Sequence, residues 1–205
     1  MKTTIRNAVI LFGSTLSVMA GAIVTPALPY ITQNFSNIDN IEFLTKLILS
    51  LPPLFIAIFS PISGYLFEKF GRKPILIIAA ILYGIAGTTG YYFNDIYFIL
   101  VGRAFLGIAI SALMTGFIVV LGDLFDGEKR NKFIGIQGAI MSFAGVIYLL
   151  LGGLLADINW NVPFITYAVS IIVGILLLFF LDETSHKTQT RQQVQFSFNL
   201  KTSLI

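Results

Sequence analysis

A short charged segment interrupts the apolar sequence between residues 64 and 74. It reads Gly-Tyr-Leu-Phe-Glu-Lys-Phe-Gly-Arg-Lys-Pro and holds one acid, three bases, two glycines and a proline. Charged side chains at this spacing can form ion pairs, and glycine lets a chain turn where other residues would clash. The segment therefore predicts a tight cationic turn that pairs with an acid elsewhere in the chain.

Two further charged residues lie inside or at the end of the long apolar stretch of residues 96–121. Asp123 follows the end of this stretch and is the natural partner for Arg72 of the charged segment. Arg103 lies about seven residues inside it. A charge in the bilayer core costs about 3 kcal/mol on insertion scales, so such a residue is functional by default. Snorkelling of its long side chain to the outer surface is the alternative interpretation.

Composition excludes several other kinds of chemistry. The chain has no cysteine, and its single histidine, His186, lies in the polar C-terminal part. We therefore expect no metal site, no cofactor and no enzyme activity. Hydrophobic residues make up 56% of the chain and charged residues 11%, against about 25% charged residues in soluble domains. This composition predicts an integral membrane protein.

The apolar sequence divides into six stretches, each near the ~20 residues that cross a bilayer as a helix. They cover residues 5–28, 44–67, 75–93, 96–121, 133–156 and 163–181. The first stretch continues to Pro26, beyond the roughly 7–15 apolar residues of a signal peptide. We therefore expect it to be an uncleaved first membrane helix.

Basic residues are distributed unevenly between the two sides of these stretches. The termini and the even-numbered connections hold 11 of the 13 Lys and Arg residues, while the opposite side holds only Lys46, and Arg103 lies within a stretch. The positive-inside rule then places both termini in the cytoplasm. Bases that flank apolar stretches indicate a lipid bilayer as partner and no nucleic acid. We expect a multi-pass protein of the plasma membrane (the inner membrane of a bacterium).

A three-residue pattern occurs twice, with every member displaced by 89 positions: Gly64, Glu68 and Pro74 recur as Gly153, Asp157 and Pro163. The first copy lies on the cytoplasmic side and the second on the opposite side. This predicts two three-helix units of inverted topology, which are characteristic of secondary transporters. The predicted fold class is an all-α membrane protein with six transmembrane helices in two inverted three-helix repeats.

The charged segment resembles the loop between the second and third helices of the major facilitator superfamily. The chain as a whole resembles the N-terminal six-helix half of these transporters, closest to the drug-efflux (multidrug resistance) branch. The loop pattern Gly-x3-Asp-Arg-x-Gly-Arg-Lys/Arg corresponds here to Gly64, Glu68, Lys69, Gly71, Arg72 and Lys73. Glu and Lys replace Asp and Arg, which keeps the charges, although Lys lacks the planar fork of Arg.

The resemblance implies a role for these charges in alternating access. Glu68, Arg72 and Asp123 would form a network that locks the outward-facing state. The alternative is that the bases only enforce topology. Arg103, followed by Gly107, resembles a fourth-helix Arg-x3-Gly element that the family links to proton coupling.

Other matching positions imply helix packing and hinges. They are Pro26 and Pro29 at the end of the first stretch, and Gly107, Gly145, Gly152 and Gly153 in the fourth and fifth. The fifth stretch has Tyr148 and Leu149 where the antiporter pattern has Gly-Pro, so the kink attributed to that proline is not encoded. The first stretch carries no carboxylate. Met19, Met114, Met141 and Tyr148 could line a pliant pocket, with plain core packing as the alternative.

The implied function is secondary active transport of a small solute. We expect efflux of an apolar or amphipathic compound by proton-coupled exchange, through rocker-switch alternating access. Residues 1–184 are expected to form the bundle, and residues 185–205 a polar cytoplasmic tail or the start of a central linker. The implied partners are a small-molecule substrate, H⁺, the bilayer and a second six-helix half, because the family uses two bundles.

The chain could therefore be a fragment of a longer transporter, a half-transporter or a decayed product. The alternative function is a non-transporting membrane interaction module.

Overall fold

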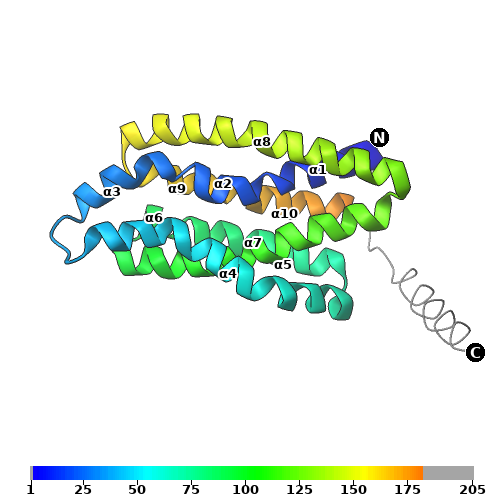
Figure 1. The fold of residues 1–205 in the computed structure, drawn as a ribbon, viewed down its shortest axis with the longest axis horizontal. Helices are drawn as coiled ribbons and strands as arrows, with labels where there is room; N and C mark the ends of the chain where they lie inside the picture. The colour runs from blue at the N-terminus through cyan, green and yellow to red at the C-terminus, as the bar shows by residue number, and fades with distance from the viewer. Residues whose placement is uncertain (1, 182–205) are drawn as a thin grey trace, which may run out of the picture.

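The computed structural model describes residues 2–181, which fold into helices that run along one common axis (Figure 1). No strand occurs among these residues. The expected tail or linker at residues 185–205 lies outside the described part of the chain.

Six helical segments are long and apolar enough to cross a membrane, as the sequence predicts. Span 1 contains α1 (Lys2–Ser14), α2 (Leu16–Ala22), the 3-10 turn η1 (Thr25–Ala27) and α3 (Leu28–Asn34). Span 2 is α4 (Ile41–Phe70), and span 3 is α5 (Arg72–Gly87) with α6 (Thr89–Tyr92). Span 4 is α7 (Ile96–Leu124) and span 5 is α8 (Gly127–Ile158). Span 6 joins α9 (Val162–Ile165), the 3-10 turn η2 (Thr166–Ala168) and α10 (Val169–Phe180).

Prolines account for part of the local structure of these spans. Pro26 and Pro29 are the second residues of η1 and α3, where a missing N–H is tolerated because the first turn has no acceptor for it. Span 1 therefore changes its helix type near Pro26. In span 2, by contrast, Pro52, Pro53 and Pro61 lie inside α4, which continues through them.

The connections alternate between the two ends of the bundle. Figure 1 shows the α3–α4 and α8–α9 connections at one end, and the N-terminus with the α4–α5 and α7–α8 connections at the other. We call the second end the basic end, because it carries Lys2, Arg6, the charged segment and Arg130. The cytoplasmic location of this end is a prediction from the charge distribution.

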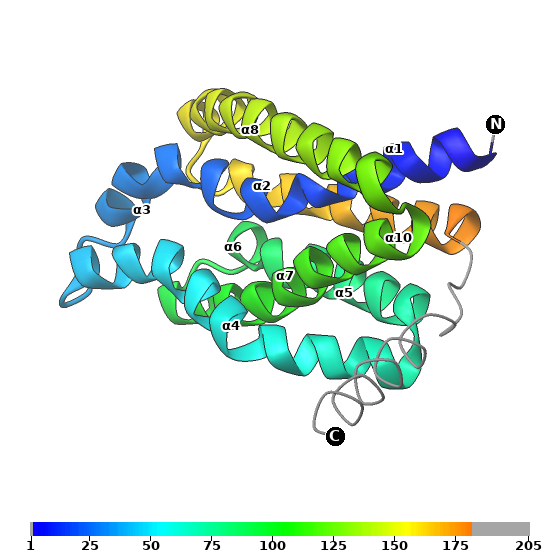
Figure 2. The same ribbon diagram turned by 45° about the vertical axis from the view of Figure 1, so that its right-hand side comes forward.

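The packing of the spans follows the predicted inverted repeat. Span 2 packs along span 4, and span 5 packs along span 1. Span 3 packs on span 4, and α10 of span 6 packs on α1 of span 1. Exchanging spans 1, 2 and 3 for spans 4, 5 and 6 turns each of these contacts into the other. Figures 1 and 2 accordingly place α4 and α8 on opposite sides of the bundle.

Two of the predicted packing glycines allow backbones to touch. A Cβ added at Gly107 would lie 2.7 Å from the Pro52 carbonyl oxygen of α4. A Cβ added at Gly152 would overlap the Ile23 carbonyl oxygen of span 1. Small residues serve such contacts in membranes, where lipid gives no hydrophobic drive for helix association. Gly145 is less crowded, with Val18 Cγ1 at 3.1 Å, and Gly153 only meets Pro26 Cβ at 3.9 Å.

We therefore expect Gly152→Ala to destabilise the bundle and Gly153→Ala to leave it intact or slightly more stable. The first change forces spans 1 and 5 apart. The second fills ordinary space and gains about 1 kcal/mol of helix propensity. Thermal unfolding in detergent, followed by the fluorescence of Trp160, measures both. Equal melting temperatures for the two variants would contradict the close contact at Gly152.

Candidate functional site

The charged segment forms the predicted tight turn. Helix α4 ends at Phe70 and α5 begins at Arg72, so Gly71 alone joins two antiparallel spans. Its backbone has φ 87° and ψ 169°, a conformation that glycine adopts freely and residues with a Cβ avoid. The second glycine of the pattern therefore has a geometric cause in the fold.

Arg72 pairs with Asp123, the acid that the sequence analysis proposed. Its Nε donates to Asp123 Oδ2 at 3.0 Å, and its Nη1 donates to the Phe67 carbonyl oxygen at 3.3 Å. The two charged side chains are 11% and 30% exposed. The pair ties the turn between spans 2 and 3 to the end of span 4 at the basic end. The gating role of this ion pair remains a prediction.

The other residues of the pattern make fewer contacts. Glu68 is exposed and forms no ion pair with Arg72 or Asp123, so the expected three-residue network is reduced to one pair within residues 2–181.

The remaining residues of the pattern make only weak contacts. Lys69 Nζ lies 5.9 Å from the Tyr65 ring centroid and 5.2 Å from that of Phe70. Gly64 makes no close contact with another helix, because an added Cβ there would meet nothing within 4 Å. Lys73 is half-buried in the first turn of α5.

Arg103 is buried in the bundle and does not snorkel to the surface. Its exposure is 2%. Nη1 donates to Tyr167 Oη at 2.9 Å and to the Ala20 carbonyl oxygen at 3.3 Å, and the guanidinium lies 4.8 Å from the Phe164 ring centroid. Its Nη2 is buried and has no hydrogen-bond partner among the described residues. This charge is therefore held by a carbonyl, a phenol and aromatic faces, with no carboxylate.

These contacts compensate for the break in span 1. Ala20 lies in the last turn of α2, where carbonyl groups lack intrahelical donors. Tyr167 Oη donates to the Ala20 carbonyl at 2.8 Å, beside Arg103, and Tyr83 Oη donates to the Leu16 carbonyl at 2.7 Å. Both tyrosines are fully buried. Spans 3, 4 and 6 thus each give span 1 a side-chain donor.

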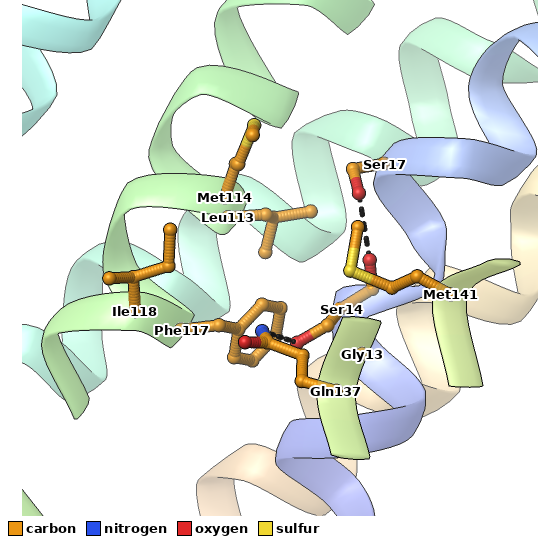
Figure 3. Close-up of a pocket in the computed structure, with 9 residues that line it drawn as sticks. All are labelled: Gly13, Ser14, Ser17, Leu113, Met114, Phe117, Ile118, Gln137 and Met141. Atoms are coloured by element: carbon orange, nitrogen blue, oxygen red, sulfur yellow. Dashed lines mark hydrogen bonds between the residues drawn. The ribbon is translucent and has the colours of Figure 1, made fainter. Parts of the chain in front are cut away.

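A hollow of about 80 Å³ lies between spans 1, 4 and 5. Figure 3 shows its wall, which includes Ser14, Ser17, Met114, Phe117, Gln137 and Met141. Two of the four residues considered for a pliant pocket, Met114 and Met141, therefore line it. Met19 is buried in the core instead, and Tyr148 forms a hydrogen bond of 2.7 Å with Thr15 Oγ1.

The polar part of this hollow was not predicted from the sequence. Gln137 Nε2 donates to Ser14 Oγ at 2.6 Å, and Ser17 Oγ donates to the Ser14 carbonyl oxygen at 2.8 Å (Figure 3). Gln137 is buried in an otherwise apolar part of α8. An amide side chain in an apolar span is a signal for such a contact, because a polar group in hydrocarbon needs a partner.

The fifth span has no proline break, as its sequence indicates. Helix α8 runs without interruption from Gly127 to Ile158. Tyr148, which stands where the antiporter pattern has glycine, instead contacts span 1 through Thr15. Spans 1 and 5 are therefore joined by three side-chain hydrogen bonds along their length, at Ser14, at Thr15 and between Tyr30 and Asp157.

The fold and site together define an integral membrane protein with the inverted-repeat architecture of secondary transporters. Residues 10–204 match the Major Facilitator Superfamily, and the chain belongs to this superfamily.

Curated relatives include efflux proteins. The class C tetracycline resistance protein of Escherichia coli is 31% identical over 205 residues, a match that covers 97% of this chain and 50% of the relative. The multidrug transporter protein MdtP of Bacillus subtilis is 28% identical, with 94% of this chain and 34% of the relative covered. The chain thus spans half or less of these relatives.

Solved structures share the fold. A D-xylose–proton symporter superposes with a TM-score of 0.78 at 17% identity, covering 97% of this chain and 54% of the symporter. The inward-open xylose transporter of E. coli superposes with a TM-score of 0.73 at 16% identity, covering 90% of this chain and 49% of that transporter.

We expect Asp123→Asn to lower the unfolding free energy by ~1 kcal/mol or less, the usual range for a partly exposed ion pair. The neutral amide keeps the shape but loses the charged acceptor for Arg72. Glu68→Gln, which removes an acid of the same turn that has no ion pair, is the matched control and should change nothing. Denaturant unfolding at low and high salt measures the effect. A loss as large for Glu68→Gln would contradict the assignment of the pair.

Proposed function

We propose that this chain forms the N-terminal six-helix half of a secondary transporter that expels a small apolar or amphipathic solute in exchange for protons. The observation that carries this proposal is the apolar hollow between spans 1, 4 and 5, with a few polar groups in its wall, in a chain of this superfamily. Such hollows, mostly apolar with few directed polar groups, suit small-molecule binding. The relatives described above, a tetracycline resistance protein and a multidrug transporter, support efflux.

The second half of the transporter would cover the hollow from the other side. Rocking of two bundles about a solute between them then exposes it alternately to each face of the membrane. The Arg72–Asp123 pair supports this motion because it fastens the turn between spans 2 and 3 to span 4. In this proposal the pair is made in the outward-facing state and broken on inward opening.

Arg103 contributes a fixed charge and does not itself carry the proton. A guanidinium stays protonated in proteins. Every acid of the six spans lies within two residues of a helix end, as Asp123 and Asp157 do, so no acid lies at mid-membrane. The proton-carrying acid would therefore come from the second half. The buried Arg103 would favour its ionised form through the attraction between opposite charges.

The proposed setting follows from the charge distribution. We place the chain in the plasma membrane, with the basic end and both termini in the cytoplasm, because Lys and Arg are retained on that side. The proposed partners are the solute, H⁺, lipid and the second six-helix half. Residues 1–184 would be the bundle and residues 185–205 a tail or the start of a linker to that half.

Proton-linked transport is testable in inside-out membrane vesicles that contain the chain together with its second six-helix half, because the proposed transporter needs both. Respiration acidifies their lumen, and an amphipathic solute that exchanges for protons should partly dissipate the gradient, which a pH-sensitive fluorophore reports. Arg103→Met removes the buried charge and should abolish this response, while Arg103→Lys should keep part of it. Equal insertion of all forms into the membrane is the control.

The possible results of this assay distinguish the role of Arg103 from transport itself. An unchanged response in Arg103→Met would contradict the role of Arg103. No response from the wild-type chain, although both halves are present in the vesicles, would contradict transport and favour the non-transporting interaction module.

The gate is testable by cysteine labelling, because the chain contains no cysteine of its own. A single reporter, Ser17→Cys, lies in the hollow. We expect Asp123→Asn to increase its labelling by a membrane-impermeant maleimide several-fold from the basic end, because the outward-facing state is no longer locked. Glu68→Gln should leave the labelling rate unchanged. Identical labelling in Asp123→Asn and in the parent would rule out the lock.

A further inference from the structure

We infer that the hollow between spans 1, 4 and 5 selects an uncharged hydrogen-bond donor, such as a hydroxyl on an apolar frame, in preference to an ether or an ammonium ion. The inference rests on the proposed function and specifies its substrate class. It is carried by the positions of the protons on Ser14, Ser17 and Gln137.

The proton of Ser14 fixes the orientation of the Gln137 amide. A serine hydroxyl has one proton, and Ser14 Oγ donates it to the Ile10 carbonyl oxygen at 2.8 Å. Ser14 Oγ must therefore act as the acceptor at its other short contact, 2.6 Å from the Gln137 amide. The amide nitrogen consequently faces Ser14, and its oxygen faces away.

Gln137 Oε1 is thus left as an acceptor at the hollow. It accepts no hydrogen bond from any described residue. Unlike Arg103 Nη2, it is not fully buried. Figure 3 shows the Gln137 side chain among the residues that line the hollow. The second proton on Nε2 is the donor that remains next to this oxygen.

Ser17 supplies a second acceptor. Its Oγ donates its single proton to the Ser14 carbonyl oxygen at 2.8 Å. Its lone pairs receive no hydrogen bond within residues 2–181, and its side chain lines the hollow. The polar wall therefore offers two acceptor atoms and one donor. A hydroxyl can satisfy both kinds, whereas an ether oxygen can use only the donor.

The rest of the wall disfavours a cation. Met114, Phe117 and Met141 are apolar, and no acid lines the hollow. Transfer of an ammonium ion into such a site loses hydration without gaining an ion pair. The volume of about 80 Å³ is below the about 150 Å³ of a cavity that holds benzene, so this half receives one substituent of a larger solute. The flexible methionines can adapt to its frame.

Three ligands with one ring system test the preference: 1-naphthol, 1-methoxynaphthalene and 1-naphthylmethylammonium. Binding to the full chain in nanodiscs is measured by equilibrium dialysis, and uptake by empty nanodiscs is subtracted. We expect naphthol to bind about three- to tenfold tighter than the ether, the usual worth of one hydrogen bond, and tighter than the ammonium. Gln137→Met keeps the length of the side chain but removes its acceptor, and should abolish the difference between naphthol and ether.

Three further variants keep the test decisive. Gly138→Ala is the matched control, because an added Cβ there meets nothing within 4 Å, and it should keep the naphthol preference. Ser17→Ala removes the other acceptor at a half-buried position and should reduce the preference even if Gln137→Met does not fold. Gln137→Glu should reverse the selectivity toward the ammonium.

The inference is overturned if the wild-type chain shows no saturable naphthol binding or binds naphthol and the ether equally. It is also overturned if the preference survives in Ser17→Ala and in every folded Gln137 variant. Failure of the proposed function looks different. A naphthol preference without proton-linked transport in vesicles contradicts transport alone, whereas transport without the preference contradicts only this inference.

Discussion

The lack of water in a bilayer core is the constraint on which this structure depends. Every backbone N–H and C=O there must find a partner within the protein. Span 1 breaks its α-helix before Pro26 and so leaves the Ala20 carbonyl, in the last turn of α2, without an intrahelical donor. Arg103 and Tyr167 reach this carbonyl from spans 4 and 6, and Tyr83 of span 3 donates to the Leu16 carbonyl. The break thus gives a structural reason for burying an arginine here. Its Nη2 forms no hydrogen bond within residues 2–181, so the guanidinium can still interact with a charge from outside the bundle.

The same constraint applies at the basic end and at the centre of the bundle. At the basic end, one glycine joins spans 2 and 3, and the Arg72–Asp123 pair fastens that turn to span 4. At the centre, serine hydroxyls of span 1 donate to its own carbonyls, so each can only accept from other groups. The polarity of the hollow follows from this assignment of protons. Span 1 is therefore both the least regular of the spans and one wall of the hollow proposed to bind the solute.

Much of this could be predicted from the sequence, because membrane spans carry long, uniform signals. The six apolar stretches each became a helical span, and the 89-residue repeat reappeared in the pairing of the spans. Gly71 and the partner of Arg72 were also predictable, since a turn of one residue and a charge in an apolar chain leave few options. Glu68 was expected to join the Arg72–Asp123 network, yet it is exposed and pairs with neither residue within the described part of the chain.

The number of spans, their alternation, the inverted repeat and the cationic turn can be inferred from the amino-acid sequence. These features follow from hydropathy, charge and glycine spacing, which act locally along the chain. The folded structure was needed to find that Arg103 contacts Ala20 and Tyr167, that Gly152 packs closely on span 1 while Gly153 does not, and that Gln137 reaches Ser14. Those contacts depend on the rotation of each helix about its axis. Hydropathy does not encode that rotation in helices that are apolar on nearly every side, because lipid and protein interior favour the same side chains.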